Sequence, residues 1–308
     1  MVIVFWIIGV GIVGLVLINF ILLRGFKNRR LSHDQFPSDL GIAFEELQIP
    51  TENQKLLYGW WIPAERSPAP LVVLTHGWGQ NQGLWLPVIP HLHQAGYHII
   101  TFDARNHGHS DGDGYANMLK FAKDILSTLA FARQNYENHI TQYYLVGFSI
   151  GGAATIYAAA RASEVKRVVT VGAFAHPAQI MREGFRTRHV PYFPIVWSLF
   201  KLIEWRIGAR LDDIAPQNNI AHISGELLLV HGRHDRTVPI ANVFQLLKRA
   251  PAERTRLYVL ENCEHSNCIP QEEFTRVLLN FLKDGHLPSQ KTAAPIHEME
   301  DLGRSSKS

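Results

Sequence analysis

Three side chains that together can activate a hydroxyl group lie far apart in this chain: Ser149, Asp235 and His265. A serine hydroxyl is a poor nucleophile at neutral pH and needs a base within hydrogen-bond reach. A carboxylate next to the base fixes the imidazole tautomer and stabilises its charged form. We therefore predict that Ser149 is a nucleophile, His265 its base and Asp235 the acid that orients the base.

The segment around the serine has the pattern of a nucleophile elbow. Gly147-Phe148-Ser149-Ile150-Gly151 follows the apolar run 143–146 and precedes an alanine-rich run, which indicates strand, sharp turn and helix. Such a turn lifts the hydroxyl above the end of the strand and aims the first helix amides at the group under attack. The five-residue pattern alone also occurs by chance, and a tight turn with an idle serine is the alternative interpretation.

The acid and the base are each expected just beyond a late strand. Asp235 follows the apolar run 226–231, and Pro239 suits the first turn of the next helix. Asp212 and Asp213 are rival acids, but they precede that strand. His265 lies beyond the last apolar run, 256–260. The alternatives are a turn-forming Asp235 and an ordinary loop histidine, and two other histidines are less well placed: His231, inside a strand, and His286, after the final helix.

An oxyanion hole requires two backbone amides that point at the developing charge. We expect these from Ile150, directly after the nucleophile, and from Trp78 in His76-Gly77-Trp78-Gly79, which ends the apolar strand 70–75. The Trp78 side chain could line an acyl pocket or only pack against a neighbouring segment. Neither a cofactor nor a metal is expected. Cys263 and Cys268 flank His265, but the loop offers only three soft ligands, and ordinary thiols are the favoured interpretation.

The surrounding sequence predicts an α/β fold in which strands and helices alternate. Such alternation indicates a mostly parallel sheet with helices on both faces. The predicted strands are 45–49, 55–62, 70–75, 97–102, 143–146, 165–172, 226–231 and 256–260, with helices at 83–95, 116–135, 152–160 and 271–283.

The chain contains, in this order, the motifs HGWG, FDARNHGHSDG, GFSIG, GRHDRTVP and ENCEHSN. With these motifs it resembles the α/β-hydrolase superfamily. It is most similar to the lipase-like and serine-aminopeptidase-like branch with an anchored N-terminus, over residues 43–284. HGWG differs from the HGGG of one lipase group. The loop 105–112 resembles D-x-R-G-H-G-x-S, with Asn106 in place of Gly, and this resemblance implies a structural scaffold below the site.

The N-terminal segment predicts a transmembrane anchor. Val2–Leu23 contains no charged residue, and a helix of this length reaches about 33 Å, enough to cross a bilayer core. Basic residues occur only after it, which predicts a single-pass protein with its N-terminus outside and its catalytic domain in the cytoplasm. A cleaved signal peptide is the alternative. The basic residues are Arg24, Lys27, Arg29 and Arg30.

The predicted domain order follows from these patterns. An anchor with its basic flank (1–30) and a linker (31–42) precede a hydrolase domain (43–285), and a polar, disordered tail (286–308) ends the chain. A long, aromatic and basic insertion (173–225) is expected to form a helical cap over the site.

The sequence favours a membrane-anchored serine hydrolase that cleaves a carboxylic ester or thioester, with a small-molecule or lipid substrate. The net charge of +3 is concentrated near the N-terminus, so no nucleic-acid partner is expected. A serine peptidase with the same triad is one alternative, and a non-catalytic, membrane-tethered interaction protein is another. A dehalogenase or epoxide hydrolase is disfavoured because those enzymes carry Asp at the elbow.

Overall fold

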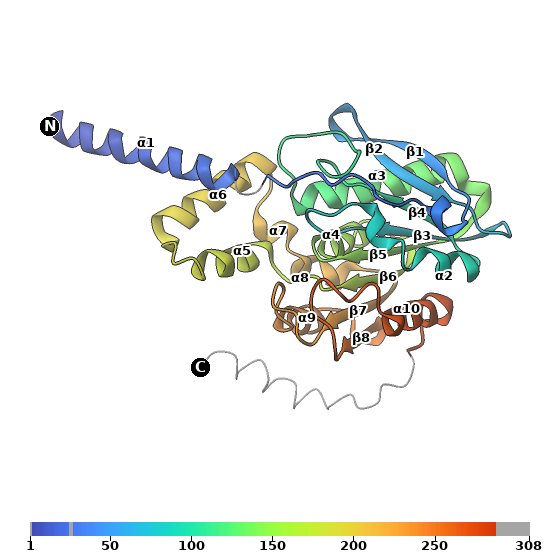
Figure 1. The fold of residues 1–308 in the computed structure, drawn as a ribbon. Coiled ribbons are helices and arrows are strands. Elements are labelled where there is room, and N and C mark those ends of the chain that lie inside the picture. The colour runs from blue at the N-terminus through green and yellow to red at the C-terminus, as the bar shows by residue number, and fades with distance from the viewer. Residues whose placement is uncertain (1, 25–26, 288–308) are drawn as a thin grey trace.

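The computed structural model describes residues 2–24 and 27–287. Its centre is an eight-stranded sheet in the order β1-β2-β4-β3-β5-β6-β7-β8 (Figure 1). Two neighbouring pairs, β1 with β2 and β2 with β4, are antiparallel, and all other pairs are parallel. The strands are β1 (Glu45–Thr51), β2 (Lys55–Ile62), β3 (Ala69–Thr75), β4 (His98–Phe102), β5 (Ile140–Phe148), β6 (Val165–Val171), β7 (Glu226–Gly232) and β8 (Thr255–Leu260).

Helices cover both faces of the sheet. Successive side chains on a strand point to opposite faces, so the central strands are apolar at nearly every position. On β3, Leu71 and Val73 pack with residues of α3 and α4, whereas Val72 and Leu74 pack with α2 and α10. The helices are α2 (Ile89–Gln94), α3 (Met118–Tyr136), α4 (Ile150–Ala159), α9 (Ala241–Leu247) and α10 (Glu272–Asp284).

The predicted α/β architecture with a mostly parallel sheet is confirmed. One helix differs from its prediction: residues 83–95 form a short 3-10 turn, η3 (Gln82–Trp85), and then α2. Pro87 lies between the two, and proline cannot donate the amide hydrogen that a continuous helix requires there. Most of the predicted disordered tail, residues 288–308, lies outside the described residues.

The segment for which the sequence predicts a cap consists of short helices between β6 and β7. Near the end of the segment, α8 packs against α4 and α9 of the main body, whereas α5 and α6 lie further from the sheet, towards α1 (Val2–Arg24) (Figure 1). These elements are α5 (Pro177–Arg186), η5 (Tyr192–Val196), α6 (Trp197–Ile207), α7 (Leu211–Ile214), α8 (Pro216–Asn219) and η6 (Ile220–His222).

The N-terminal apolar run forms the helix α1 (Val2–Arg24), but the prediction that Val2–Leu23 spans a membrane is wrong. Within the described residues, no helix combines the length and the apolar character that crossing a bilayer requires. The predicted single-pass topology, with an outside N-terminus and a cytoplasmic catalytic domain, depended on that span and is overturned with it. α1 instead has contacts with protein: it touches α6, and Asn19 Nδ2 donates to Ser198 Oγ at 3.1 Å.

Candidate active site

The turn between β5 and α4 has the geometry of a nucleophile elbow. Ser149 has φ of 55° and ψ of −121°, a conformation that side-chain-bearing residues rarely adopt. A Cβ on Gly147 would lie 2.4 Å from Thr155 Oγ1, and one on Gly151 would lie 2.3 Å from the His76 carbonyl oxygen. Both flanking glycines are therefore required, because any side chain would collide with a neighbouring strand or helix.

The structure brings the three predicted catalytic side chains together. His265 Nε2 lies 2.9 Å from Ser149 Oγ, and His265 Nδ1 lies 2.6 Å from Asp235 Oδ2. Since an ionised carboxylate can only accept, the Nδ1–H donates to Asp235, and the Nε2 lone pair faces the serine hydroxyl. This is the tautomer that can accept a proton from Ser149.

Backbone amides hold the carboxylate of Asp235 in place. Its side chain is fully buried, and Oδ1 accepts hydrogen bonds from the amides of Thr237 at 2.9 Å and Val238 at 2.7 Å. His231 Nε2 also donates to the Val238 carbonyl oxygen at 2.8 Å, and this bond helps to hold the turn of residues 235–238. Oδ2 is thereby left to face His265.

Three of the rival residues, Asp212, Asp213 and His286, lie elsewhere. Asp212 contacts His176 at 2.9 Å, between α7 and the start of α5, and not the serine. Asp213 follows it on the same short helix, and His286 pairs with Asp284 after α10. Within the described part of the chain, no cluster of three or more His, Cys, Asp or Glu side chains could hold a metal ion.

The loop after β3 leaves the amide of Trp78 available. The neighbouring amides donate to side chains: Gly77 to Gln80 Oε1 at 3.1 Å and Gly79 to His107 Nε2 at 3.1 Å. Trp78 N has no protein acceptor within the described residues. Burial lowers the pKa of His107 to about 3, so this ring is neutral and its Nε2 can accept. The second predicted donor, Ile150, is the first residue of α4, where an amide has no partner within the helix.

The predicted linker, residues 31–42, helps to hold this loop. Asp103 is fully buried directly after β4, and its Oδ1 accepts a hydrogen bond of 2.8 Å from the amide of Gln82. Its Oδ2 lies 2.8 Å from Nε2 of His33, and both side chains are inaccessible to solvent. Burial disfavours the charged carboxylate, but the hydrogen bond to His33 and the nearby imidazoles outweigh it, so the pKa of Asp103 is lowered.

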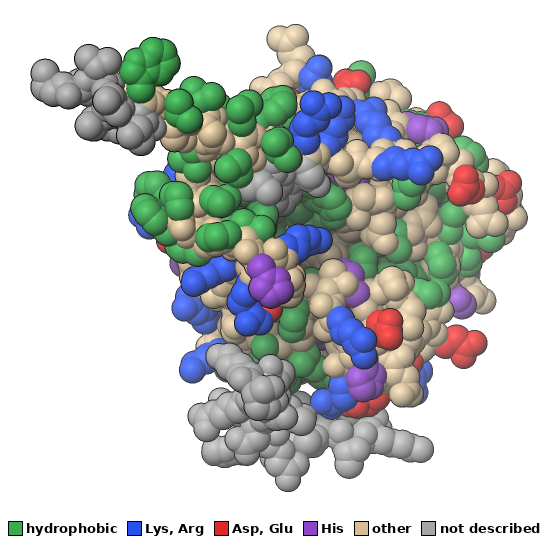
Figure 2. Space-filling view, turned by 60° about the vertical axis from the view of Figure 1, so that its left-hand side comes forward, with side chains coloured by type: hydrophobic (Ala, Val, Ile, Leu, Met, Phe, Trp, Pro, Cys, Tyr) green, Lys and Arg blue, Asp and Glu red, His purple; other side chains and the backbone are tan. Residues whose placement is uncertain are grey.

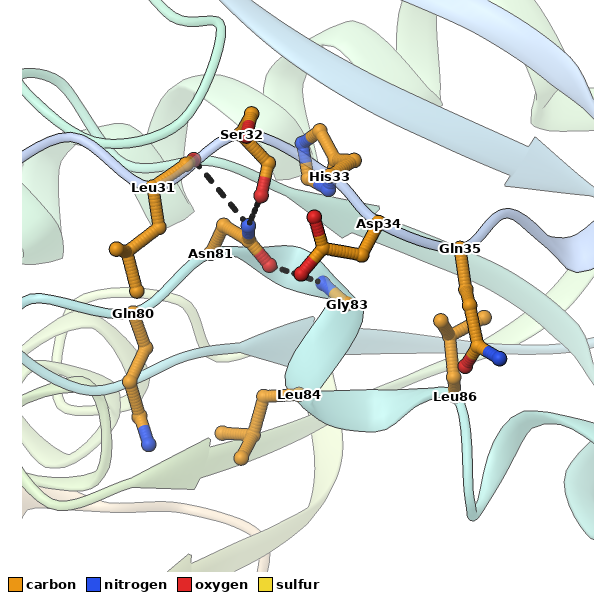
Figure 3. Close-up of a pocket in the computed structure, with 10 residues that line it drawn as sticks. All are labelled: Leu31, Ser32, His33, Asp34, Gln35, Gln80, Asn81, Gly83, Leu84 and Leu86. Carbon is orange, nitrogen blue, oxygen red and sulfur yellow. Dashed lines mark hydrogen bonds between the residues drawn. The ribbon is translucent and has the colours of Figure 1, made fainter.

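Asn81 adds a second tie between the N-terminal segment and the loop. Its Nδ2 donates to the carbonyl oxygens of Leu31 at 3.3 Å and Ser32 at 2.9 Å, and its Oδ1 accepts the amide of Gly83 (Figure 3). A cavity of about 580 Å³ lies between the two segments. The hydrophobic pattern of residues 31–42 does not indicate these contacts, because they depend on three isolated polar side chains: His33, Asn81 and Asp103.

Gly172 is a further site residue that the sequence did not indicate. It directly follows β6 and has φ of 61°. A Cβ at this position would lie 3.2 Å from Cε1 and Nδ1 of His265 and 3.4 Å from Asp235 Oδ2. The absence of a side chain here leaves room for the imidazole beside its carboxylate.

The comparisons with known proteins agree with this architecture. A family model described as "alpha/beta hydrolase fold" matches residues 70–189. The structure of the Pyrococcus furiosus esterase Pf2001 superposes with a TM-score of 0.69 at 24% identity, and the match covers 83% of this chain and 98% of that one. This chain has the α/β-hydrolase fold.

Two sequence relatives cover most of this chain. The pimeloyl-[acyl-carrier protein] methyl ester esterase of Vibrio vulnificus strain YJ016 is 25% identical over 252 residues, which are 69% of this chain and 94% of the relative. The uncharacterised protein YqkD of Bacillus subtilis is 25% identical over 243 residues, 76% of this chain and 77% of the relative. The sequence resemblance to this fold is thus confirmed, whereas assignment to a lipase-like branch stays a prediction.

Proposed function

We propose that this chain is a serine hydrolase that cleaves a carboxylic ester or thioester of a small molecule through an acyl-serine intermediate. The observation that carries the proposal is the continuous hydrogen-bonded line from Ser149 Oγ through His265 to Asp235, with distances of 2.9 and 2.6 Å. Its similarity to an esterase and to a methyl ester esterase supports an ester as the substrate.

The geometry supports a two-step reaction. Ser149 Oγ attacks the carbonyl carbon while its proton passes to His265 Nε2, and the carbonyl oxygen becomes an oxyanion within reach of the amides of Trp78 and Ile150. The protonated imidazole then donates that proton to the departing alcohol or thiol, which leaves an acyl group on Ser149. Water attacks this acyl group in the same way, and the carboxylic acid and free serine are released.

We infer an apolar acyl group from the apolar side chains that the fold leaves exposed. Trp78, which carries one predicted oxyanion amide, leaves 37% of its surface exposed. Hydrophobic side chains also gather along α1 and the helices between β6 and β7 (Figure 2). The exposed aromatic members of that surface are Tyr192, Phe193, Trp197 and Trp205.

The peptidase alternative has less support. An aminopeptidase must bind a substrate ammonium group with free carboxylates, yet three of the four acidic side chains in residues 173–225 are already paired. Glu183 pairs with Arg186, Glu204 with Lys201, and Asp212 with His176.

The test is Ser149→Ala, measured with a panel of p-nitrophenyl esters of increasing acyl length and with a fluorophosphonate label. We expect loss of turnover and of labelling with little change in stability, because only one hydroxyl is removed. Ser163→Ala is the matched control, since Ser163 is exposed in the turn after α4. Normal turnover by folded Ser149→Ala would refute the assignment.

A further inference from the structure

Two thiols lie on either side of the predicted base, in the loop that follows β8. Cys263 and Cys268 are both buried, and both are free thiols in this structure. Their Sγ atoms are 2.6 Å apart. A disulfide bond is about 2.05 Å long, so little movement separates this pair from bonding distance.

Hydrogen bonds hold the turn between these thiols in one conformation. Asn267 Oδ1 accepts the amide of Glu264 at 2.8 Å, and Cys268 Sγ donates to the Glu264 carbonyl oxygen at 3.0 Å. The carbonyl oxygen of Cys263 accepts the amide of His234 at 3.0 Å, which ties this turn to the loop that carries the predicted acid. The thiols are therefore held next to each other by the folded chain.

We propose that Cys263 and Cys268 are a modification site at which a peroxide forms a reversible disulfide, closing a covalent ring around the turn that bears His265. The thiol chemistry depends only on the geometry of the pair. Its consequence for catalysis rests on the proposed function, in which His265 is the base.

The reaction balances with one molecule of hydrogen peroxide. The Cys263 thiolate attacks one peroxide oxygen, the O–O bond breaks, and a sulfenic acid and hydroxide form. The sulfur of Cys268 then attacks the Cys263 sulfur, the S–S bond forms, and the sulfenic oxygen leaves as hydroxide. The two thiol protons convert both hydroxides to water, and an added dithiol reverses the oxidation.

The surroundings of the two sulfurs differ in a way that assigns the first step to Cys263. The contact with Cys268 lowers the pKa of Cys263, whereas that contact and burial together raise the pKa of Cys268. A thiolate is the reactive form of cysteine. Glu264, Ser266 and Asn267 are exposed, so the turn itself lies at the surface even though both sulfurs are covered.

The expected result of ring closure is greater stability without loss of turnover. A short loop closed by a disulfide restricts the unfolded chain, and for this loop we expect Tm to rise by roughly 4 °C. Because the sulfurs are already close, His265 stays in position, so turnover of p-nitrophenyl acetate should remain within about twofold of the reduced protein.

The test uses the full chain with hydrogen peroxide, followed by alkylation in denaturant, intact mass measurement, and size-exclusion chromatography and a melting curve of the undenatured protein. We expect a protein of unchanged size that is two hydrogens lighter, resists alkylation at both cysteines and melts higher until dithiothreitol is added. Cys268→Ala should trap a sulfenic acid at Cys263 that dimedone labels. Cys263→Ala should give little such labelling at Cys268.

The proposal is overturned if both thiols still alkylate after peroxide, or if the disulfide forms between two molecules. An oxidised protein with an internal disulfide but an unchanged Tm would also contradict it. If the mass and Tm change as expected while the reduced protein neither cleaves esters nor reacts with fluorophosphonate, the thiol site stands and the proposed function fails.

Discussion

Replacing Gly172 with alanine tests whether the position of the predicted base, His265, affects turnover independently of the stability of the fold. At φ of 61° any residue with a Cβ is strained, which costs about 1–2 kcal/mol of stability. The new methyl group would also lie 3.2 Å from two ring atoms of His265, so the imidazole must move by a few tenths of an ångström. A displacement of 1 Å in an active site can cost about 100-fold in rate, so we expect kcat to fall roughly 3- to 10-fold.

Gly96→Ala is the matched control for this experiment. Gly96 follows α2 with φ of 85°, and a Cβ there would meet no atom within 4 Å. It should therefore lose a similar amount of stability, about 1–2 kcal/mol, while kcat stays unchanged. Urea unfolding gives the free energies, and p-nitrophenyl acetate turnover gives the rates, both measured well below the melting temperatures.

The two variants together show whether kcat depends on the contact between residue 172 and His265 or on backbone strain alone. A lower kcat in Gly172→Ala alone supports the reasoning. Wild-type kcat in Gly172→Ala would refute the claim that the space beside His265 limits the position of the ring. Equal loss of kcat in both variants would point to general destabilisation instead.

Further predictions concern the acid, the pH dependence of stability and the N-terminal segment. Asp235→Asn should lower turnover by about 10⁴-fold, because the imidazole tautomer is no longer fixed, whereas Asp213→Asn should leave it near wild type; the reverse result would identify the wrong acid. The pKa of His107 is about 3 in the folded protein and near 6.5 when unfolded, so only the unfolded state binds this proton between those values. The contribution of His107 to the free energy of unfolding should accordingly fall as pH drops below about 6.5, by up to about 1.4 kcal/mol per pH unit, and His107→Gln should flatten the slope in urea titrations; an unchanged slope would contradict this. His33→Ala leaves the buried carboxylate of Asp103 without one partner and should lower the unfolding free energy by about 1–3 kcal/mol at pH 7, and an unaltered urea midpoint would show that this pair does not stabilise the fold.

The parts of the fold with a strong local pattern could be predicted from the sequence. Apolar runs such as 226–231, which alternate with helical segments, favour buried strands, and the glycines around Ser149 indicate a turn in which larger side chains would collide with their neighbours. Asp235 and His265 each follow a predicted strand, which was enough to place both residues at the same edge of the sheet. The structure brings them together there.

The parts that could not be predicted depend on contacts between distant segments. The approach of Gly172 to the His265 ring follows from the packing of β6 beside β7, and a lone glycine after a strand does not reveal it. His33 reaches Asp103 across 70 residues, and isolated polar residues in an irregular segment carry no periodic signal. The charge-free run Val2–Leu23 predicts a helix correctly, but apolar composition does not specify what that helix contacts.

The backbone at Ser149 has a consequence for how such a chain can evolve. A residue held at φ of 55° and ψ of −121° costs about 1–3 kcal/mol, and glycine would relieve much of that cost. Selection for stability alone would therefore favour glycine at this position, whereas selection for turnover retains the strained serine. The loss of selection for activity should leave an early trace in descendants of this chain: a glycine at position 149 inside an otherwise intact and more stable fold.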